Sequence, residues 1–169
     1  LSDSQWFLEK TDKGEIACYI RNRHNLHFGM ARNQGLKLST GDYIAISDND
    51  ILFQNGWLEE CIEFLEKHEG KYLATPIAPD FTHTNDKYFH GEIDGWRLNM
   101  RAGSNIFVMR KKDFEQIGMF DIHRVAGTKY TDRYVRMGYL MACMPKPKAV
   151  DCAFRKGYDL NKEIEHLEL

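Results

Sequence analysis

The 169-residue sequence contains no apolar run close to the roughly 20 residues that a membrane-spanning helix needs. No secretory signal is visible, although the chain opens with Leu1 rather than Met, so we expect the native N-terminus to lie upstream. A basic excess is missing too, because the formal net charge is −2. This argues against a nucleic-acid-binding protein, but it leaves room for a small phosphorylated ligand held by a few cations or a metal.

Cysteine pairs are also missing. None of the four cysteines belongs to a C-x-x-C motif, and their spacing suggests neither a zinc site nor a disulfide framework. Reduced thiols are the plain interpretation, so we expect a cytoplasmic protein, with peripheral attachment to a membrane left open.

A substantial core is possible, because 43% of the residues are hydrophobic and 12% are aromatic. The length fits one domain of ordinary size. We therefore expect residues 1–169 to form a single domain, with a charged tail at 161–169.

The first half of the chain alternates helix-like and strand-like patterns. Residues 43–46 are a nearly continuous apolar run, which is typical of a strand buried on both faces in a parallel sheet. The alternation predicts an α/β fold with a Rossmann-like, mostly parallel central sheet flanked by helices. The expected helices are 2–10, 28–38 and 56–68, and the expected strands are 15–22, 43–46 and 71–78.

The second half has shorter elements. Residues 80–94 are polar, aromatic and rich in histidine, and they show no period, so we expect a long loop or a flap. The remaining expected strands are 104–109, 139–144 and 149–152, and helical segments are expected at 111–117, at 131–137 and in the tail.

An acidic triplet, Asp48-Asn49-Asp50, directly follows the 43–46 strand. In parallel α/β sheets, ligands bind beyond the carboxyl ends of the strands. Two half-buried carboxylates are costly unless they are paired, and Mg²⁺ or Mn²⁺ prefers such oxygen ligands together with substrate phosphates. The triplet therefore predicts a metal site at Asp48 and Asp50.

Two other interpretations of the triplet stay open. Asp48 and Asn49 can simply form a turn and cap the helix near Gly56. A calcium loop would use Asp48, Asp50 and Glu59, but Phe53 stands where that loop needs glycine, which argues against it.

Three short motifs carry a resemblance to a known family. They are Asn-Leu-His-Phe-Gly-Met-Ala-Arg-Asn-Gln-Gly at 25–35, Thr-Gly-Asp-Tyr-Ile at 40–44, and Ser-Asp-Asn-Asp at 47–50. In this order and spacing they resemble the family 2 glycosyltransferases, which have a GT-A fold. The resemblance covers roughly residues 15–145.

The second half of the chain adds to the resemblance. Residues 103–110 are similar to the family's acceptor-side strand, and residues 117–121 look like its Gly-Gly-Phe-Asp-Glu turn. Thr131-Asp132 stands where the family usually has Glu-Asp, whose second residue is the general base of inverting members. Threonine in place of glutamate is a departure that leaves the aspartate intact.

The resemblance implies a metal-dependent, inverting transfer of a sugar from a nucleotide diphosphate sugar to an acceptor hydroxyl. It implies Mg²⁺ or Mn²⁺ as cofactor and a saccharide, lipid-linked or protein acceptor, without nucleic acid. By residue, it implies Asp132 as base, Asp48 and Asp50 as metal ligands, and Arg32, Asn33, Asp48 and Asn49 on the donor. The expected acceptor-side residues are Trp96, Arg97, Gly103, Ser104 and Asp121.

One departure concerns the start of the chain. Family members begin with a strand and an acidic loop that bind the nucleobase, and nothing before Ser2 can supply them. We expect either a missing N-terminal segment or another chain, as in an oligomer, to complete the site.

Simpler roles stay open for several residues. Arg32 and Asn33 can decorate an exposed helix face, and Asp132 can cap a helix over 133–137. His83 and His90 can be metal or flap contacts, but solvated loop histidines are more common. Two rival functions also remain: a nucleotidyltransferase, which usually carries a glycine-rich basic loop that is not seen here, and a non-catalytic sugar- or nucleotide-binding module.

Overall fold

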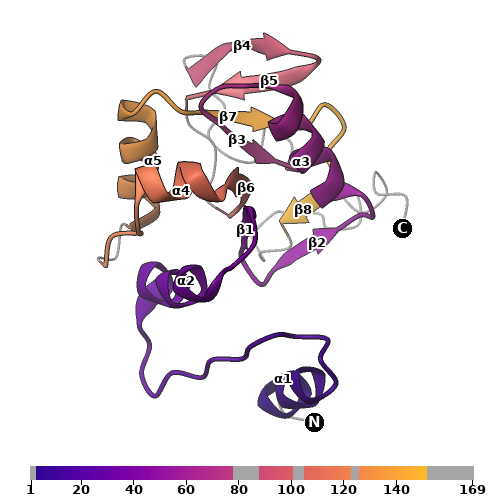
Figure 1. The fold of residues 1–169 in the computed structure, drawn as a ribbon, viewed down its shortest axis with the longest axis vertical. Helices are drawn as coiled ribbons and strands as arrows, with labels where there is room; N and C mark the ends of the chain where they lie inside the picture. The colour runs from indigo at the N-terminus through magenta and orange to yellow at the C-terminus, as the bar shows by residue number, and fades with distance from the viewer. Residues whose placement is uncertain (1–2, 78–87, 101–104, 123–125, 152–169) are drawn as a thin grey trace, which may run out of the picture.

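The computed structural model describes residues 3–77, 88–100, 105–122 and 126–151 (Figure 1). Predictions on residues 78–87, 101–104 and 152–169, including His83, Gly103, Ser104 and the charged tail, lie outside this part of the chain. Within it, no helix is long and apolar enough to cross a bilayer.

The main sheet has six strands in the order β1-β6-β3-β7-β5-β4. Among these neighbours only β3 and β7 run parallel; the other pairs are antiparallel. The fold is therefore mixed α/β, but the prediction of a mostly parallel, Rossmann-like sheet is not confirmed. The strands are β1 (Tyr43–Ser47), β3 (Tyr72–Thr75), β4 (Phe89–Ile93), β5 (Trp96–Asn99), β6 (Ile106–Arg110) and β7 (Leu140–Cys143).

The antiparallel direction follows from how β6 enters the sheet. After β3 the chain makes the β4–β5 hairpin, and β6 then lies between β1 and β3 and runs opposite to both. Strands β1 and β3 therefore point the same way, with α3 between them in the chain, but the antiparallel β6 separates them in the sheet. Strand β4 also corrects the prediction that residues 80–94 form only a loop.

Helices cover both faces of this sheet. Leu73, Phe107 and Met109 belong to a core cluster with α2 (His27–Leu38), α4 (Lys111–Ile117) and α5 (Ala126–Arg136). The alternate residues Ala74 and Val108 pack against α3 (Trp57–Lys67) on the opposite face. This period-two division confirms the expected layered arrangement of helices around a sheet.

Strand β1 forms one end of the described sheet order. Its residues Ile44 and Ile46 are buried, but Ala45 and Ser47 are exposed, so the prediction of a strand buried on both faces is wrong. The ladder with β6 is bracketed by two backbone hydrogen bonds of 2.7 Å, from Lys111 to Asp42 and from Asp48 to Asn105. The last bond fixes the backbone of Asp48 where β1 ends.

The predicted strand at 15–22 does not form. Helix α1 (Asp3–Asp12) is followed by an extended segment whose Tyr19 stacks on Phe7 at 5.1 Å between ring centroids. Asn22 and Gln34 then exchange side-chain amide hydrogen bonds of 2.9 and 3.0 Å, which attach this segment to α2. An alternating sequence makes a stable strand only when a neighbouring strand pairs with it, and the described residues offer none here.

A second, two-stranded sheet lies beyond the end of β1. It joins β2 (Ile51–Phe53) to β8 (Ala149–Asp151) in antiparallel register. Phe53 stacks on Trp57 at 4.4 Å, which packs this sheet against the start of α3. The chain therefore passes from the main sheet to the small sheet within residues 48–50.

Candidate functional site

The acidic triplet forms the short turn between β1 and β2. Asn49 and Asp50 are exposed, and the Asp48 side chain is 40% exposed. Because strands on both sides hold the turn, the backbone that carries its two carboxylates is held at the end of the main sheet. Asp48 and Asn49 do not cap α3, since that helix begins at Trp57 after Gly56, which has a left-handed φ of 79°.

Arg32 faces this turn from α2. Its Nη2 donates to Asp48 Oδ1 in a short ion pair, and its side chain is only 11% exposed. The guanidinium lies over the rings of Phe28 and Phe120, 4.8 and 5.3 Å from their centroids. Its other terminal nitrogen, Nη1, is buried and has no hydrogen-bond partner in the described part of the chain. A buried donor without a partner is costly, so this nitrogen is a candidate contact for an anionic ligand.

Asn33 follows Arg32 on α2 but turns to a different partner. Its Nδ2 donates to the Phe120 carbonyl, and its Oδ1 accepts from the Phe120 amide, both at 2.9 Å. Phe120 is 2% exposed and stacks on Tyr130 at 4.0 Å. Neither Arg32 nor Asn33 therefore only decorates an exposed helix face.

Asp121 comes directly after Phe120 and pairs with Arg133 of α5, with 2.6 Å between Oδ2 and Nη2. Asp132 is the preceding residue on α5. It lies in the interior of that helix, which begins at Ala126, so the alternative that it caps a helix over 133–137 is wrong. Contacts through Phe120 and Asp121 thus connect the Asp48 side of the site with the helix that carries Asp132.

The expected acceptor-side residues Trp96 and Arg97 lie on β5, far along the sheet. Trp96 is 8% exposed and stacks on Phe64 of α3 at 4.4 Å, on the face opposite α2. Arg97 lies over the Phe89 ring at 4.6 Å. Four strand spacings separate β5 from β1, which is roughly 19 Å. The described contacts do not bring these residues to the acidic turn.

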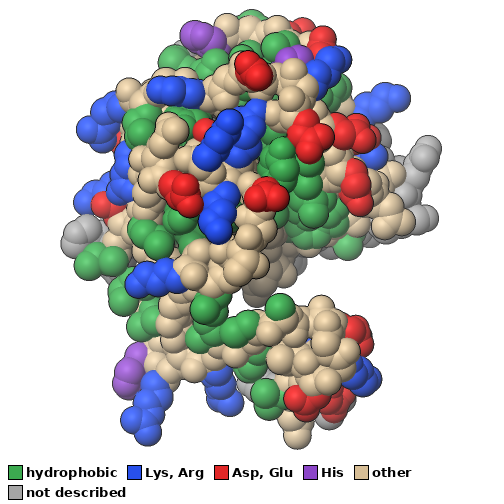
Figure 2. All heavy atoms as spheres, viewed as in Figure 1, with side chains coloured by type: hydrophobic (Ala, Val, Ile, Leu, Met, Phe, Trp, Pro, Cys, Tyr) green, Lys and Arg blue, Asp and Glu red, His purple; other side chains and the backbone are tan. Residues whose placement is uncertain are grey.

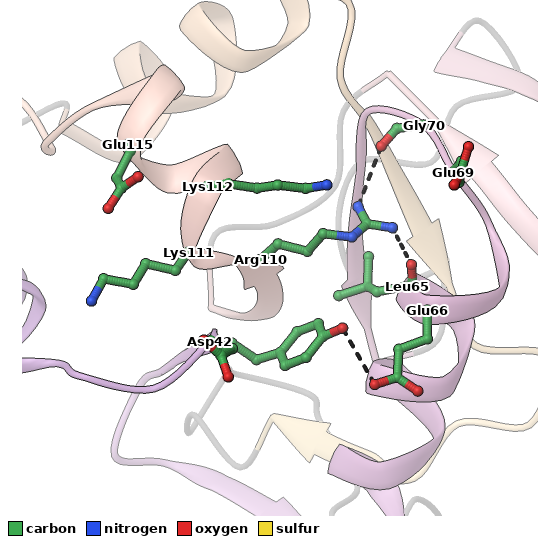
Figure 3. A pocket seen from close by; sticks show the side chains of 10 residues that line it. Asp42, Leu65, Glu66, Glu69, Gly70, Arg110, Lys111, Lys112 and Glu115 are labelled. Carbon is green, nitrogen blue, oxygen red and sulfur yellow. Dashed lines mark hydrogen bonds between the residues drawn. The ribbon is translucent and has the colours of Figure 1, made fainter.

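A pocket of about 790 Å³ opens at the other end of β1, between α3 and α4 (Figure 3). Arg110 crosses it and donates to carbonyl oxygens at the end of α3, including those of Leu65 and His68. Figure 3 shows Lys111 pointing away and acidic residues around the rim. The pocket's central cation therefore serves as a helix cap, and the chemistry expected from the sequence lies at the opposite end of the strand.

Acidic and basic side chains are interspersed on the face shown in Figure 2, in keeping with the small net charge. Within the residues that the structure describes, no group of three or more His, Cys, Asp or Glu side chains can hold a metal ion alone. Asp48 and Asp50 supply hard oxygen ligands, but a Mg²⁺ or Mn²⁺ site here needs further oxygens from a ligand or water. The donor set fits such an ion only when these further oxygens complete it.

Sequence reasoning missed Phe28, Phe120 and Arg133. Phe28 stands four residues before Arg32 on one helix, and that spacing was a usable signal. Phe120 falls inside the 117–121 motif, but its contact with Asn33 spans 87 positions, and Arg133 reaches Asp121 from a separate helix, so no local pattern predicted either role.

The fold and this turn define a mixed α/β protein with two carboxylates in the turn between a main and a minor sheet. The family model described as Glycosyl transferase family 2 matches residues 5–128, which is most of the chain. The chain therefore belongs to glycosyl transferase family 2, a family that fits a GT-A type of fold. The comparison with curated proteins found no match. Arg32, Asn33, Asp48, Asp50 and Asp121 lie inside the matched region, whereas Asp132 lies four residues beyond it.

Proposed function

We propose that this protein transfers a sugar from a nucleotide diphosphate sugar to an acceptor hydroxyl, with inversion at the anomeric carbon and with Mg²⁺ or Mn²⁺. The observation that carries the proposal is the acidic turn at the end of β1, with Arg32 held against Asp48 by two aromatic rings. Membership of glycosyl transferase family 2 supports the class of reaction.

In this proposal the turn binds the donor's diphosphate. Asp50, which is exposed, is the main metal ligand, and Asp48 assists it. A divalent ion bound there supplies neutralisation of the charge that develops on the leaving diphosphate. Asn49 and Arg32 contact the donor directly, and Asn33 supports the site by joining α2 to the loop at Phe120.

Asp132 is the proposed general base. The acceptor oxygen attacks the anomeric carbon, the bond from that carbon to the phosphate oxygen breaks, and its electron pair leaves with the nucleoside diphosphate. The acceptor proton goes to the Asp132 carboxylate. Help of this kind contributes roughly a hundred- to ten-thousandfold to the rate. The Asp121–Arg133 ion pair fixes the neighbouring position on α5 and so helps to orient this side chain.

The acceptor contacts are assigned to regions of the sheet and not to single atoms. Asp121 is connected to the turn through Phe120, whose ring contacts Arg32, whereas Trp96 and Arg97 would need an acceptor that extends along the sheet. A saccharide, a lipid-linked sugar and a protein remain candidate acceptors.

A panel of nucleotide diphosphate sugars, each with and without Mn²⁺, tests the function by thermal shift and by release of nucleoside diphosphate. We expect at least one donor to raise the melting temperature, and to do so only with metal. Asp132→Asn is expected to abolish transfer and to leave this metal-dependent shift intact. Binding without any transfer by the wild-type protein would favour the sugar- or nucleotide-binding module, and equal loss of binding and transfer in Asp132→Asn would reject the base assignment.

A further inference from the structure

The ion pair between Arg32 and Asp48 joins a proposed metal ligand to a fixed positive charge. Only 11% of the Arg32 side chain is exposed, whereas 40% of the Asp48 side chain is exposed. Phe28 and Phe120 hold the guanidinium in place from the side. The charge therefore stays close to the acidic turn whether or not a ligand is present.

A fixed cation at this place opposes the binding of a second cation. Like charges repel strongly where water is partly excluded, and Asp48 Oδ1 already accepts a charge-assisted hydrogen bond from Arg32. A divalent ion that uses Asp48 must displace this bond or tolerate the guanidinium beside it. The protein alone is thus a poor metal site, although both carboxylates are present.

The second terminal nitrogen of Arg32, Nη1, allows the guanidinium to bind an anion other than Asp48. Nη1 is buried without a hydrogen-bond partner in the described residues, and Arg32 also lines a pocket of about 210 Å³ between α2 and β1. A guanidinium binds phosphate oxygens through two parallel N–H groups, which here would satisfy Nη1 and replace the bond to Asp48. A diphosphate therefore removes the obstacle to the metal at the same time as it supplies metal ligands.

From this geometry we propose that Arg32 acts as an internal counter-ion, which holds Asp48 until a diphosphate arrives and then exchanges Asp48 for that diphosphate. The consequence is that metal and donor bind cooperatively, and that the free protein does not retain Mg²⁺ or Mn²⁺ at the turn. The inference rests on the proposed function, because it assigns the diphosphate and the metal to this site. Arg32 is a positioning residue for Asp48 and a contact for the donor.

The test measures two ligands separately on the wild-type protein and Arg32→Gln. Mn²⁺ alone is titrated by electron paramagnetic resonance, and inorganic pyrophosphate alone is titrated by calorimetry. We expect Arg32→Gln to bind Mn²⁺ at least fivefold more tightly than the wild type, and to bind pyrophosphate at least tenfold more weakly. A purely structural role for Arg32 would weaken both or change neither, so either of those results overturns the inference.

Lys37→Gln is the matched control, because Lys37 is an exposed cation on the same helix and its removal lowers the net charge equally. It is expected to leave both affinities within twofold of the wild type. If Arg32→Gln fails to fold by circular dichroism, Arg32→Lys replaces it. Arg32→Lys keeps the charge and loses the paired N–H groups, so weak Mn²⁺ binding should persist while pyrophosphate binding falls; unchanged pyrophosphate affinity contradicts the exchange.

A further titration of the wild type with Mn²⁺ and a nucleoside diphosphate together separates this inference from the function on which it rests. If the wild type binds neither a metal–nucleotide complex nor pyrophosphate, and Arg32→Gln gains no Mn²⁺ affinity, the proposed function itself fails. If the wild type binds a metal–nucleotide complex but Arg32→Gln shows no gain in Mn²⁺ affinity, only the counter-ion role fails.

Discussion

Asn33 pairs with the backbone of Phe120 as one strand residue pairs with another. One atom of its amide donates and the other accepts, at 2.9 Å in both bonds, across 87 positions of sequence. The pair joins α2, which carries Arg32, to the loop that carries Asp121. The orientation of the proposed site therefore depends on a side chain that need not touch the substrate.

Replacing Asn33 with alanine is expected to destabilise the fold by about 2 kcal/mol, because the buried Phe120 amide and carbonyl both lose their partner. Urea unfolding measures this change. Gln34→Ala is the control: its partner Asn22 is exposed, so a loss below about 0.5 kcal/mol is expected. Equal effects of the two variants would show that the Phe120 contact is not special.

Arg110 is expected to be the most costly single cation to remove from the scaffold. It donates to the carbonyls of Leu65 and His68 and pairs with Asp113, which is 5% exposed. Arg110→Gln leaves that carboxylate buried, with the hydrogen bond from the Tyr139 hydroxyl as its remaining contact among the described residues. Removing one member of a buried pair costs about 3 kcal/mol.

Chemical denaturation of Arg110→Gln and of Lys112→Gln checks this value, since Lys112 is an exposed cation only two residues further along the chain, on α4. A loss in Arg110→Gln no greater than in the control would contradict the capping role. The proposed sugar-transfer site lies at the other end of β1, so metal-dependent donor affinity is expected to survive in folded Arg110→Gln protein.

Asp94 gives the stability of the β4–β5 hairpin a pH dependence. Lys67, which is hydrogen-bonded to it at 2.7 Å, lowers the pKa of Asp94 below its ordinary value of 3.8, and His68 adds to this with its Nε2 at 3.0 Å. A lowered pKa means that the contribution is present above pH 3.8 and is lost as the pH falls through the folded-state value.

Thermal unfolding of the wild type and Asp94→Asn on both sides of pH 3.8 tests this link. The wild type is expected to be more stable than the variant above that pH, and the difference is expected to shrink below it. Glu92→Gln on β4 is the control, because Glu92 is exposed. A difference that grows on acidification would contradict the assignment.

Thiol reactivity is expected to divide the described cysteines sharply. Burial raises the pKa of the Cys61 thiol to about 12 and that of Cys143 to about 11, whereas Cys18 is exposed. Iodoacetamide attacks the thiolate, so we expect peptide mass spectrometry to find Cys18 labelled at neutral pH and Cys61 and Cys143 protected. In denaturant all three should react, and rapid labelling of Cys61 in the native protein would refute the core packing around α3.

Local patterns predicted most helices and strands, because the spacing of apolar residues depends only on the sequence of each segment. Helix α4 was predicted at its observed bounds, and α2 and β1 to within a residue at either end. Strand direction was not predictable in the same way: β6 enters between β1 and β3 through pairing with residues far away in sequence. The segment 15–22 has a strand-like pattern, but a strand also needs a neighbour.

In the candidate site too, local features were predictable and features that depend on tertiary packing were not. The acidic turn was evident because two carboxylates follow an apolar strand, and the turn does lie at the end of β1. The exposure of Ala45 and Ser47, the burial of Trp96 and the pairing of Asp48 with Arg32 all depend on which segments pack together. The packing between distant segments decides whether a polar residue faces a ligand or another side chain.

The central claim is that the turn at residues 48–50 binds a divalent ion together with a diphosphate. Its most direct test is a titration of Mn²⁺ in the presence of the nucleoside diphosphate whose sugar derivative gives the largest thermal shift, on wild type, Asp50→Ala and Asp42→Ala. Asp42 is the control, an exposed carboxylate at the opposite end of β1. We expect Asp50→Ala to lose at least tenfold in affinity and Asp42→Ala to match the wild type; an Asp50→Ala affinity equal to that of the wild type would contradict the account.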